Sequence, residues 1–305
     1  MRVLFYPTIK FNEHWSIDGV VQVHSQPFFF EELSTGFYGV RTDLLQAHLT
    51  YSRFWGKKSL TVKAGQLNTA FGSFLLRYDD TQNPLVGIPP TYGYYYDGTT
   101  TRGLTGAEVD STLGKLDLRG QFTNSSPANP RSIFDKDQYG EWTGGAGYTI
   151  KQGLRVGVSG YRGPYLDREH PFFFPGEIDP RNLPGSGVGV DVEWGGGPWN
   201  MNGEWRRYVL QYTKVPNFLQ QSGYAEIKRT LHPRWYVAAR LGYLRTSAFP
   251  APNTYEVAVG YRPSSYQLVK LEYQIQQSPL IRGTLQNVLA VQVVTTLKPL
   301  TIAGR

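Results

Sequence analysis

Apolar and polar residues alternate one by one along most of the 305-residue chain. In segment 115–122, Leu116, Leu118 and Phe122 share one side, and charged or amide residues take the other. Successive side chains of a β-strand point to opposite faces, so this alternation predicts strands with one apolar and one polar face. The same pattern recurs in segments 60–65, 199–206, 235–243, 255–262 and 269–276.

The segments between the predicted strands alternate in length. Short turns fall at 12–14, 55–57, 113–114, 151–153, 195–197, 232–234 and 263–265. Longer stretches rich in Pro, Gly, Asn and Tyr fall at 26–36, 68–102, 125–139, 164–185, 211–217, 246–253 and 277–284. Short turns at one rim and long loops at the other are typical of outer-membrane barrels.

The fold class predicted from these patterns is all-β, a transmembrane antiparallel up-and-down β-barrel forming one domain over residues 1–305. About fifteen strands can be counted, and bacterial single-chain barrels usually have an even number. We therefore expect about 16 strands, with the first strand and a secretory signal upstream of Met1. A 14-stranded barrel is the alternative count.

Composition agrees with a wall that is apolar on one face only. Hydrophobic residues make up 40% and mean hydropathy is −0.38, while Tyr, Phe, Trp and Gly are abundant. No stretch approaches the roughly 18 consecutive apolar residues of a transmembrane helix. Cysteine is absent, which removes disulfides and thiolate metal sites and suits export through an oxidising compartment. The net charge is +7, but Lys and Arg are spread evenly, so we expect no nucleic-acid partner.

Aromatic residues on the apolar face lie near the predicted strand ends. The residues assigned to the short-turn rim are Trp15, Tyr51, Tyr148, Trp194, Trp199, Trp235 and Tyr261. Those assigned to the loop rim are Trp142, Trp205, Tyr243, Tyr255 and Tyr273. They share a face and bracket smaller apolar residues, as the two aromatic girdles of a membrane barrel do. The alternative explanation is the general preference of aromatic residues for strands.

The opposite face carries many charges of both signs. The predicted pore-lining residues are Lys63, Glu108, Asp110, Lys115, Asp117, Arg119, Arg155, Glu204, Arg206, Arg240, Lys270 and Glu272. So many charges cannot be buried in a dry core without a large desolvation cost, which indicates a water-filled lumen. For any single residue, a salt bridge that braces the wall is the alternative role.

The longest connection, Asn68 to Arg102, is the best candidate for a constriction. An excursion of this length in a compact protein usually has a function, and this one is apolar enough to pack. One interpretation is that it folds into the barrel and narrows the pore, with Arg77, Asp79, Asp80 and Arg102 near the constriction. The other is an external loop that packs over the rim.

One strand-to-loop element resembles a known family. The strand 60–65 followed by Gln66-Leu67-Asn68-Thr69-Ala70-Phe71-Gly72 is similar to the "AGQF-x-T-P-F-G" element of phosphate-selective porins O and P. In that family the element leaves a strand and enters a long loop, and Ala70 stands where the family commonly has Pro. Segments 124–129 and 156–165 also resemble porin-like proteins of soil bacteria. The resemblance implies a porin fold, whereas the arginine and lysine ladder that accompanies phosphate selectivity is not found in this sequence.

The sequence gives little support to an enzymatic, metal-binding or nucleotide-binding function. The five histidines, His14, His24, His48, His170 and His232, show no zinc spacing. There is no G-x-S-x-G, no Walker A motif and no dinucleotide fingerprint. We therefore predict no catalytic residues, no metal and no cofactor.

The sequence therefore predicts an outer-membrane porin-like channel for passive diffusion of small hydrophilic solutes or ions. The expected partners are outer-membrane lipid and the solutes themselves, and a homotrimer is left open. The alternatives are an outer-membrane barrel enzyme or plugged structural barrel, and a secreted soluble β-protein that binds carbohydrate through its tyrosines.

Overall fold

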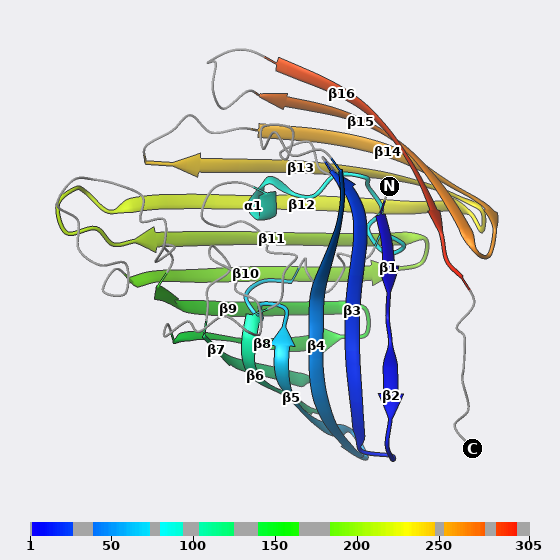
Figure 1. Cartoon of the computed structure of the whole chain (residues 1–305). Helices are drawn as coiled ribbons and strands as arrows, with labels where there is room; N and C mark the ends of the chain where they lie inside the picture. The colour runs from blue at the N-terminus through cyan, green and yellow to red at the C-terminus, as the bar shows by residue number, and fades with distance from the viewer. Residues whose placement is uncertain are drawn as a thin grey trace.

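The chain folds into one curled antiparallel sheet (Figure 1). The computed structural model describes residues 2–26, 39–73, 80–93, 104–124, 140–164, 184–247, 253–277 and 285–297. The strands are β1 (Arg2–Phe5), β2 (Thr8–Lys10), β3 (Trp15–Gln26), β4 (Gly39–Trp55), β5 (Lys58–Leu67), β6 (Leu104–Leu113), β7 (Leu116–Thr123), β8 (Glu141–Lys151), β9 (Leu154–Pro164), β10 (Pro184–Gly196), β11 (Trp199–Leu210), β12 (Phe218–His232), β13 (Trp235–Thr246), β14 (Asn253–Ser264), β15 (Gln267–Gln277) and β16 (Leu285–Thr295). One short helix, α1 (Pro90–Gly93), lies between β5 and β6.

The sixteen strands follow an up-and-down order. Each strand from β3 to β16 pairs with its neighbours in sequence, and β1 and β2 both pair with β3. The predicted antiparallel up-and-down fold of about 16 strands is thus confirmed. Because β1 and β2 both pair with β3, the pairing path among the described residues is fifteen strands wide, the number counted from the sequence. Within the described residues the pairing path ends at β1 on one side and β16 on the other. A strand upstream of Met1 stays a prediction.

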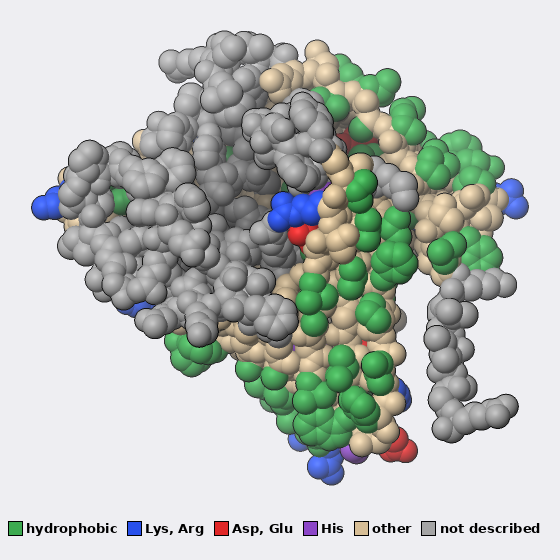
Figure 2. Space-filling model, viewed as in Figure 1, with side chains coloured by type: hydrophobic (Ala, Val, Ile, Leu, Met, Phe, Trp, Pro, Cys, Tyr) green, Lys and Arg blue, Asp and Glu red, His purple; other side chains and the backbone are tan. Residues whose placement is uncertain are grey.

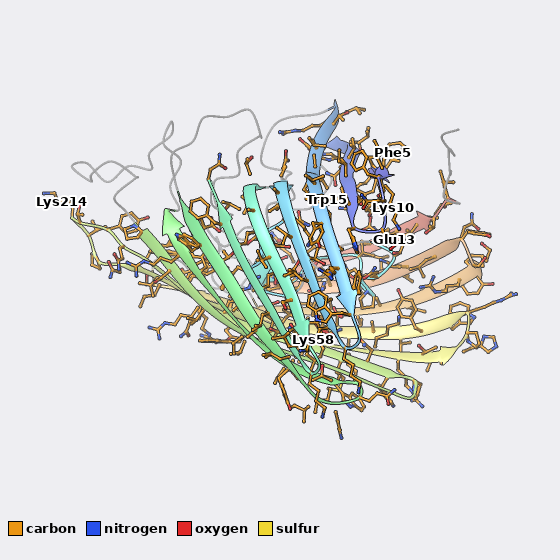
Figure 3. The ribbon with its side chains drawn as sticks, turned by 90° about the horizontal axis from the view of Figure 1, so that it is seen from below. Phe5, Lys10, Glu13, Trp15, Lys58 and Lys214 are labelled. Atoms are coloured by element: carbon orange, nitrogen blue, oxygen red, sulfur yellow. The ribbon has the colours of Figure 1, made fainter. Side chains whose placement is uncertain are left out.

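All seven predicted short turns lie between paired strands. In four of them a glycine takes a positive φ, for example Gly56 at 60° and Gly114 at 69°. Glycine adopts this left-handed conformation without the steric cost of a Cβ, which allows strands to reverse direction within two residues. Figure 3 shows the two rims: Lys58 follows a short turn, and Lys214 lies in the β11–β12 connection at the opposite rim.

The outward face is apolar and exposed. Val257, Val259 and Leu271 are among the large hydrophobic residues that point away from the interior, and Figure 2 shows such side chains over β3 and β4. Aromatic pairs mark the short-turn rim: Trp235 lies opposite Tyr261 with ring centroids 4.3 Å apart, and Trp15 lies 5.0 Å from Tyr51. An apolar belt with aromatic residues at its edge is the exterior of a membrane barrel. No helix among the described residues is long and apolar enough to cross a membrane.

Candidate functional site

The described parts of the connection between β5 and β6 lie against the inner face of the sheet. These parts are residues 68–73 and 80–93, and α1 contacts β12 and β13. Phe71 is almost fully buried between Tyr161 and Tyr208, with ring centroids at 6.0 and 5.2 Å. These parts of the connection therefore occupy the interior and not the outside of the rim.

Glu204 of β11 holds both described parts of the connection. Its carboxylate accepts hydrogen bonds from the Tyr92 hydroxyl at 2.7 and 2.8 Å and from the Ser73 hydroxyl at 3.2 Å. The Arg206 guanidinium binds the same carboxylate at 2.7 Å and lies 3.9 Å from the centre of the Tyr92 ring. Burial raises the pKa of the Tyr92 hydroxyl well above its ordinary value, so this group remains protonated and donates.

Gly72 is required where the connection passes over Glu204 and Arg206. Its φ is 89°, and a Cβ at this position would collide with the ends of both side chains and with the Tyr92 hydroxyl. The Arg206 guanidinium also donates a hydrogen bond of 2.8 Å to the Phe71 carbonyl. The family-like element that ends at Gly72 thus brings the chain onto the inner wall.

A second anchor lies on β12–β14 around Arg240. Its guanidinium forms ion pairs with Glu226, at 3.3 Å, and with Glu256, and it donates a hydrogen bond of 2.7 Å to the Gly87 carbonyl. The side chain of Arg240 is 0% exposed, because residues of the connection cover it.

Residues of β15 hold the same part of the connection. The Lys270 ammonium donates to the carbonyls of Asp80, at 2.6 Å, and Leu85, at 3.1 Å. Glu272 accepts from the backbone N–H of Gly87 at 3.2 Å. Leu85 is fully buried against Tyr236, Ala258 and Leu268. Charged, hydrogen-bonded and apolar contacts together fix residues 80–87 on β13–β15.

Asp80 links distant parts of the pairing path. Its carboxylate binds the guanidinium of Arg2 on β1 at 2.6 Å, while its carbonyl accepts from Lys270 on β15. The two ends of the sheet therefore lie on either side of the connection. This arrangement is the curvature expected of a barrel wall.

A different set of charges, on β5–β10, is partly open to the interior. Lys63 binds Glu108 at 2.7 Å and Asp110 at 2.8 Å, and Arg119 binds Asp110 at 2.6 Å. Arg119 is 27% exposed, in contrast to Arg240.

Further ion pairs of this set lie on β7–β10, where glycines leave room for the charged side chains. Arg155, 28% exposed, binds Asp117 at 2.6 Å and Asp191 at 2.7 Å. Its guanidinium lies over Gly147, and Asp191 lies over Gly157, where any Cβ would collide with them. A pocket of about 170 Å³ separates this wall from residues 70–73 of the connection. Charged side chains beside an internal cavity are the arrangement a hydrated passage needs.

The predicted pore-lining residues thus separate into two sets. Those partly open to the interior are Lys63, Asp110, Asp117, Arg119 and Arg155, joined by the more buried Glu108. Those that hold the connection are Glu204, Arg206, Arg240, Lys270 and Glu272. Lys115 belongs to neither set. The turn between β6 and β7 takes Gly114 and Lys115 out of the strands, so Lys115 is exposed at the rim and its ammonium donates a hydrogen bond to the Ile150 carbonyl. Arg77, Asp79 and Arg102 lie outside the described residues.

Sequence reasoning missed two contacts of the connection. Nothing in the local pattern links Tyr92 to Glu204, which lies 112 residues further along the chain, or Arg2 to Asp80. A buried acid facing a Pro-Pro-Thr-Tyr segment has no sequence signature. Among the described residues no cluster of three or more His, Asp or Glu side chains could hold a metal ion, and the absence of a metal stays a prediction.

Comparison with known proteins identifies the fold. No protein-family model matches the chain, and no curated protein matches it by sequence. Among solved structures, OmpT of Vibrio cholerae in a trimer form is 12% identical, with a TM-score of 0.59 over 90% of this chain and 80% of that one. An anion-selective porin of Comamonas acidovorans is 9% identical, with a TM-score of 0.60 over 97% and 84%. OmpF of Salmonella typhi, in complex with daunomycin, is 10% identical, with a TM-score of 0.62 over 96% and 89%. The chain has the fold of bacterial outer-membrane porins, as its apolar exterior also indicates.

Proposed function

We propose that the protein is a non-enzymatic outer-membrane channel through which small hydrophilic solutes or ions diffuse passively. The observation that carries the proposal is the partly exposed set of ion pairs on β5–β10, beside a pocket bounded by the inserted connection. Partly exposed charges on an inner wall avoid most of the desolvation cost that a buried ion pair carries, provided that water reaches them. Residues 70–73 of the connection line the same pocket, and this supports our assignment of residues 68–102 as the constriction.

Single-channel recording tests the proposal. The full-length protein, inserted into a planar bilayer, is expected to give discrete ohmic current steps. A properly inserted barrel that gives no steps contradicts the proposal. It would favour a plugged barrel, because the connection already covers the inner face of β12–β15.

The open wall carries more carboxylates than cations. The carboxylates are those of Glu108, Asp110, Asp117, Asp191 and Glu193, and the cations are Lys63, Arg119 and Arg155. We therefore propose a modest cation preference instead of the phosphate selectivity of the porins O and P. A homotrimer, the form described for one structural neighbour, is part of the proposal.

Neutralising the open carboxylates is expected to change ion selectivity. The double variant Asp110→Asn and Asp117→Asn removes two partly exposed negative charges. Its reversal potential under a salt gradient is expected to move toward that of an anion-preferring channel. The control, Glu256→Gln, changes a carboxyl that is 0% exposed, and its reversal potential is expected to stay at the wild-type value. Equal shifts in both variants would show that selectivity arises elsewhere.

A further inference from the structure

Two pockets adjoin on the inner wall, on the short-turn side of the docked connection. One has a volume of about 320 Å³ and includes Glu193 of β10, and the other has a volume of about 290 Å³ and includes Lys228 of β12. Asn200 and Asn202 of β11 line both pockets, so they form the ridge between them. Pro84 of the connection borders the second pocket.

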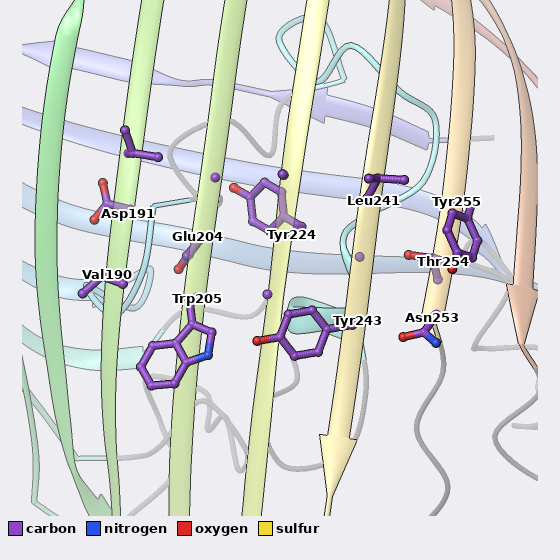
Figure 4. A pocket seen from close by; sticks show the side chains of 15 residues that line it. Val190, Asp191, Glu204, Trp205, Tyr224, Leu241, Tyr243, Asn253, Thr254 and Tyr255 are labelled. Atoms are coloured by element: carbon purple, nitrogen blue, oxygen red, sulfur yellow. The ribbon is translucent and has the colours of Figure 1, made fainter.

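The register places the polar side chains of both pockets on the inner face. Glu193 pairs with Asn202, and each lies two residues from a member of the pair Asp191 and Glu204, which Figure 4 labels. Side chains two residues apart in a strand share a face, so Glu193 and Asn202 point inward as Glu204 does. The next inward position toward the short-turn rim holds Asn200, which pairs with Lys228.

The pocket on the β10 side offers hydrogen-bond acceptors. The half-buried Glu193 carboxylate has no hydrogen bond or ion pair within the described part of the chain. Arg155 beside it already binds two other carboxylates, at 2.6 and 2.7 Å. The Asn202 amide nitrogen donates to Asn200 and Glu226, and none of the described residues donates to the Asn202 side-chain oxygen.

The pocket on the β12 side offers hydrogen-bond donors. The Lys228 ammonium lies 4.7 Å from the centre of the Tyr236 ring and has no hydrogen bond or ion pair among the residues that the structure describes. Glu226, the acid nearest to it along β12, is bound by Arg240. The Asn200 amide nitrogen donates to none of the described residues, because only its side-chain oxygen is used.

We propose that the two pockets bind a short zwitterionic peptide that diffuses through the barrel. Its ammonium binds Glu193, and its carboxylate binds Lys228. A central peptide group crosses the ridge, donates to the Asn202 oxygen and accepts from the Asn200 amide. Glu193 and Lys228 lie about 10 Å apart across two strands and about 7 Å apart along them. Two or three residues, at about 3.3 Å each, bridge the gap that these side chains leave.

The separation of donors from acceptors favours a zwitterion over other small solutes. A simple anion or cation gains one end of the site and is repelled by the other, because like charges in contact are unfavourable. A sugar hydroxyl both donates and accepts, so a sugar gains nothing from having the two kinds of group on opposite sides of a ridge. The peptide site rests on the proposed channel only for access of the solute to the interior.

Saturation-transfer NMR of the detergent-purified barrel tests the site without any measurement of current. The probes are triglycine, N-acetyltriglycine, which lacks the ammonium, and triglycine amide, which lacks the carboxylate. Triglycine is expected to bind about tenfold more tightly than either analogue, as for the loss of one charged hydrogen-bond partner.

Two variants separate the two ends of the site. Glu193→Gln is expected to weaken triglycine and triglycine amide about tenfold and to leave N-acetyltriglycine unchanged. Lys228→Gln is expected to weaken triglycine and N-acetyltriglycine and to leave triglycine amide unchanged. The matched controls, Glu13→Gln and Lys115→Gln, change exposed charges at the short-turn rim and are expected to bind all three probes as the wild type does.

Each outcome decides for or against the peptide site. Equal weakening of all three probes in Glu193→Gln and Lys228→Gln would overturn it, because a damaged wall or diffuse charge does not distinguish the two ends. Triglycine that binds no better than its analogues would overturn it as well. The crossed pattern in a barrel that gives no current steps would keep the site and contradict the channel. Current steps without the crossed pattern would keep the channel and overturn the site.

Discussion

Replacing Arg240 with alanine is expected to lower the free energy of unfolding by about 3–5 kcal/mol, the cost of removing one partner from a buried ion pair. The guanidinium is 0% exposed and balances Glu226 and Glu256, whose side chains are 2% and 0% exposed. Without it, these two buried carboxylates lose the guanidinium that binds both of them under the connection. Urea unfolding in detergent micelles, followed by tryptophan fluorescence, measures the change.

The control for this experiment is Arg262→Ala. Arg262 is a half-buried arginine near the short-turn end of β14, the strand that also carries Glu256. Removing its side chain is expected to lower the free energy of unfolding by less than about 1 kcal/mol, as for a partly solvated charge. If both variants unfold at the same urea concentration, the Arg240 cluster does not support the wall.

The strands and their outward faces could be predicted from the sequence because side chains alternate between the two faces of a β-strand with a period of two residues. The alternation at Trp235–Tyr243 and Tyr255–Arg262 sets which residues face outward, and the short turn at 263–265 sets where the chain reverses. These local features sufficed to predict that Trp235 and Tyr261 would share the short-turn rim, where they are paired. Register is specified strongly when one face must be apolar.

The division of the inner charges could not be predicted in this way. Arg119 and Arg240 have the same sequence context: each lies on the polar side of an alternating strand and faces acids. They differ only because Gly87, 153 residues before Arg240 in sequence, covers Arg240. Where the connection docks depends on long-range packing of Leu85 and Phe71, which has no periodic signal. The sequence therefore indicates which residues face inward and leaves open which of them meet water.

Detaching the connection from the wall is expected to raise conductance severalfold. Leu85 is fully buried, and its side chain packs on Tyr236, Ala258 and Leu268, while the Lys270 ammonium binds its backbone carbonyl. The substitution Leu85→Asp removes these apolar contacts and places a carboxylate in their stead, and a charge is costly to bury in an apolar site. Residues 80–87 are therefore expected to leave the inner face. The wall persists, because water then solvates Arg240, Lys270 and their partners.

Single-channel recording of Leu85→Asp beside Gln82→Asp checks this expectation. Gln82 is exposed on the same segment, so the same new charge stays in water and conductance is expected to remain at the wild-type value. Larger steps in Leu85→Asp alone mean that the docked connection sets the width of the passage. Identical steps in both variants would mean that the narrowest point lies elsewhere. A rise in Gln82→Asp alone would indicate that charge in the lumen, and not the position of the connection, controls the current.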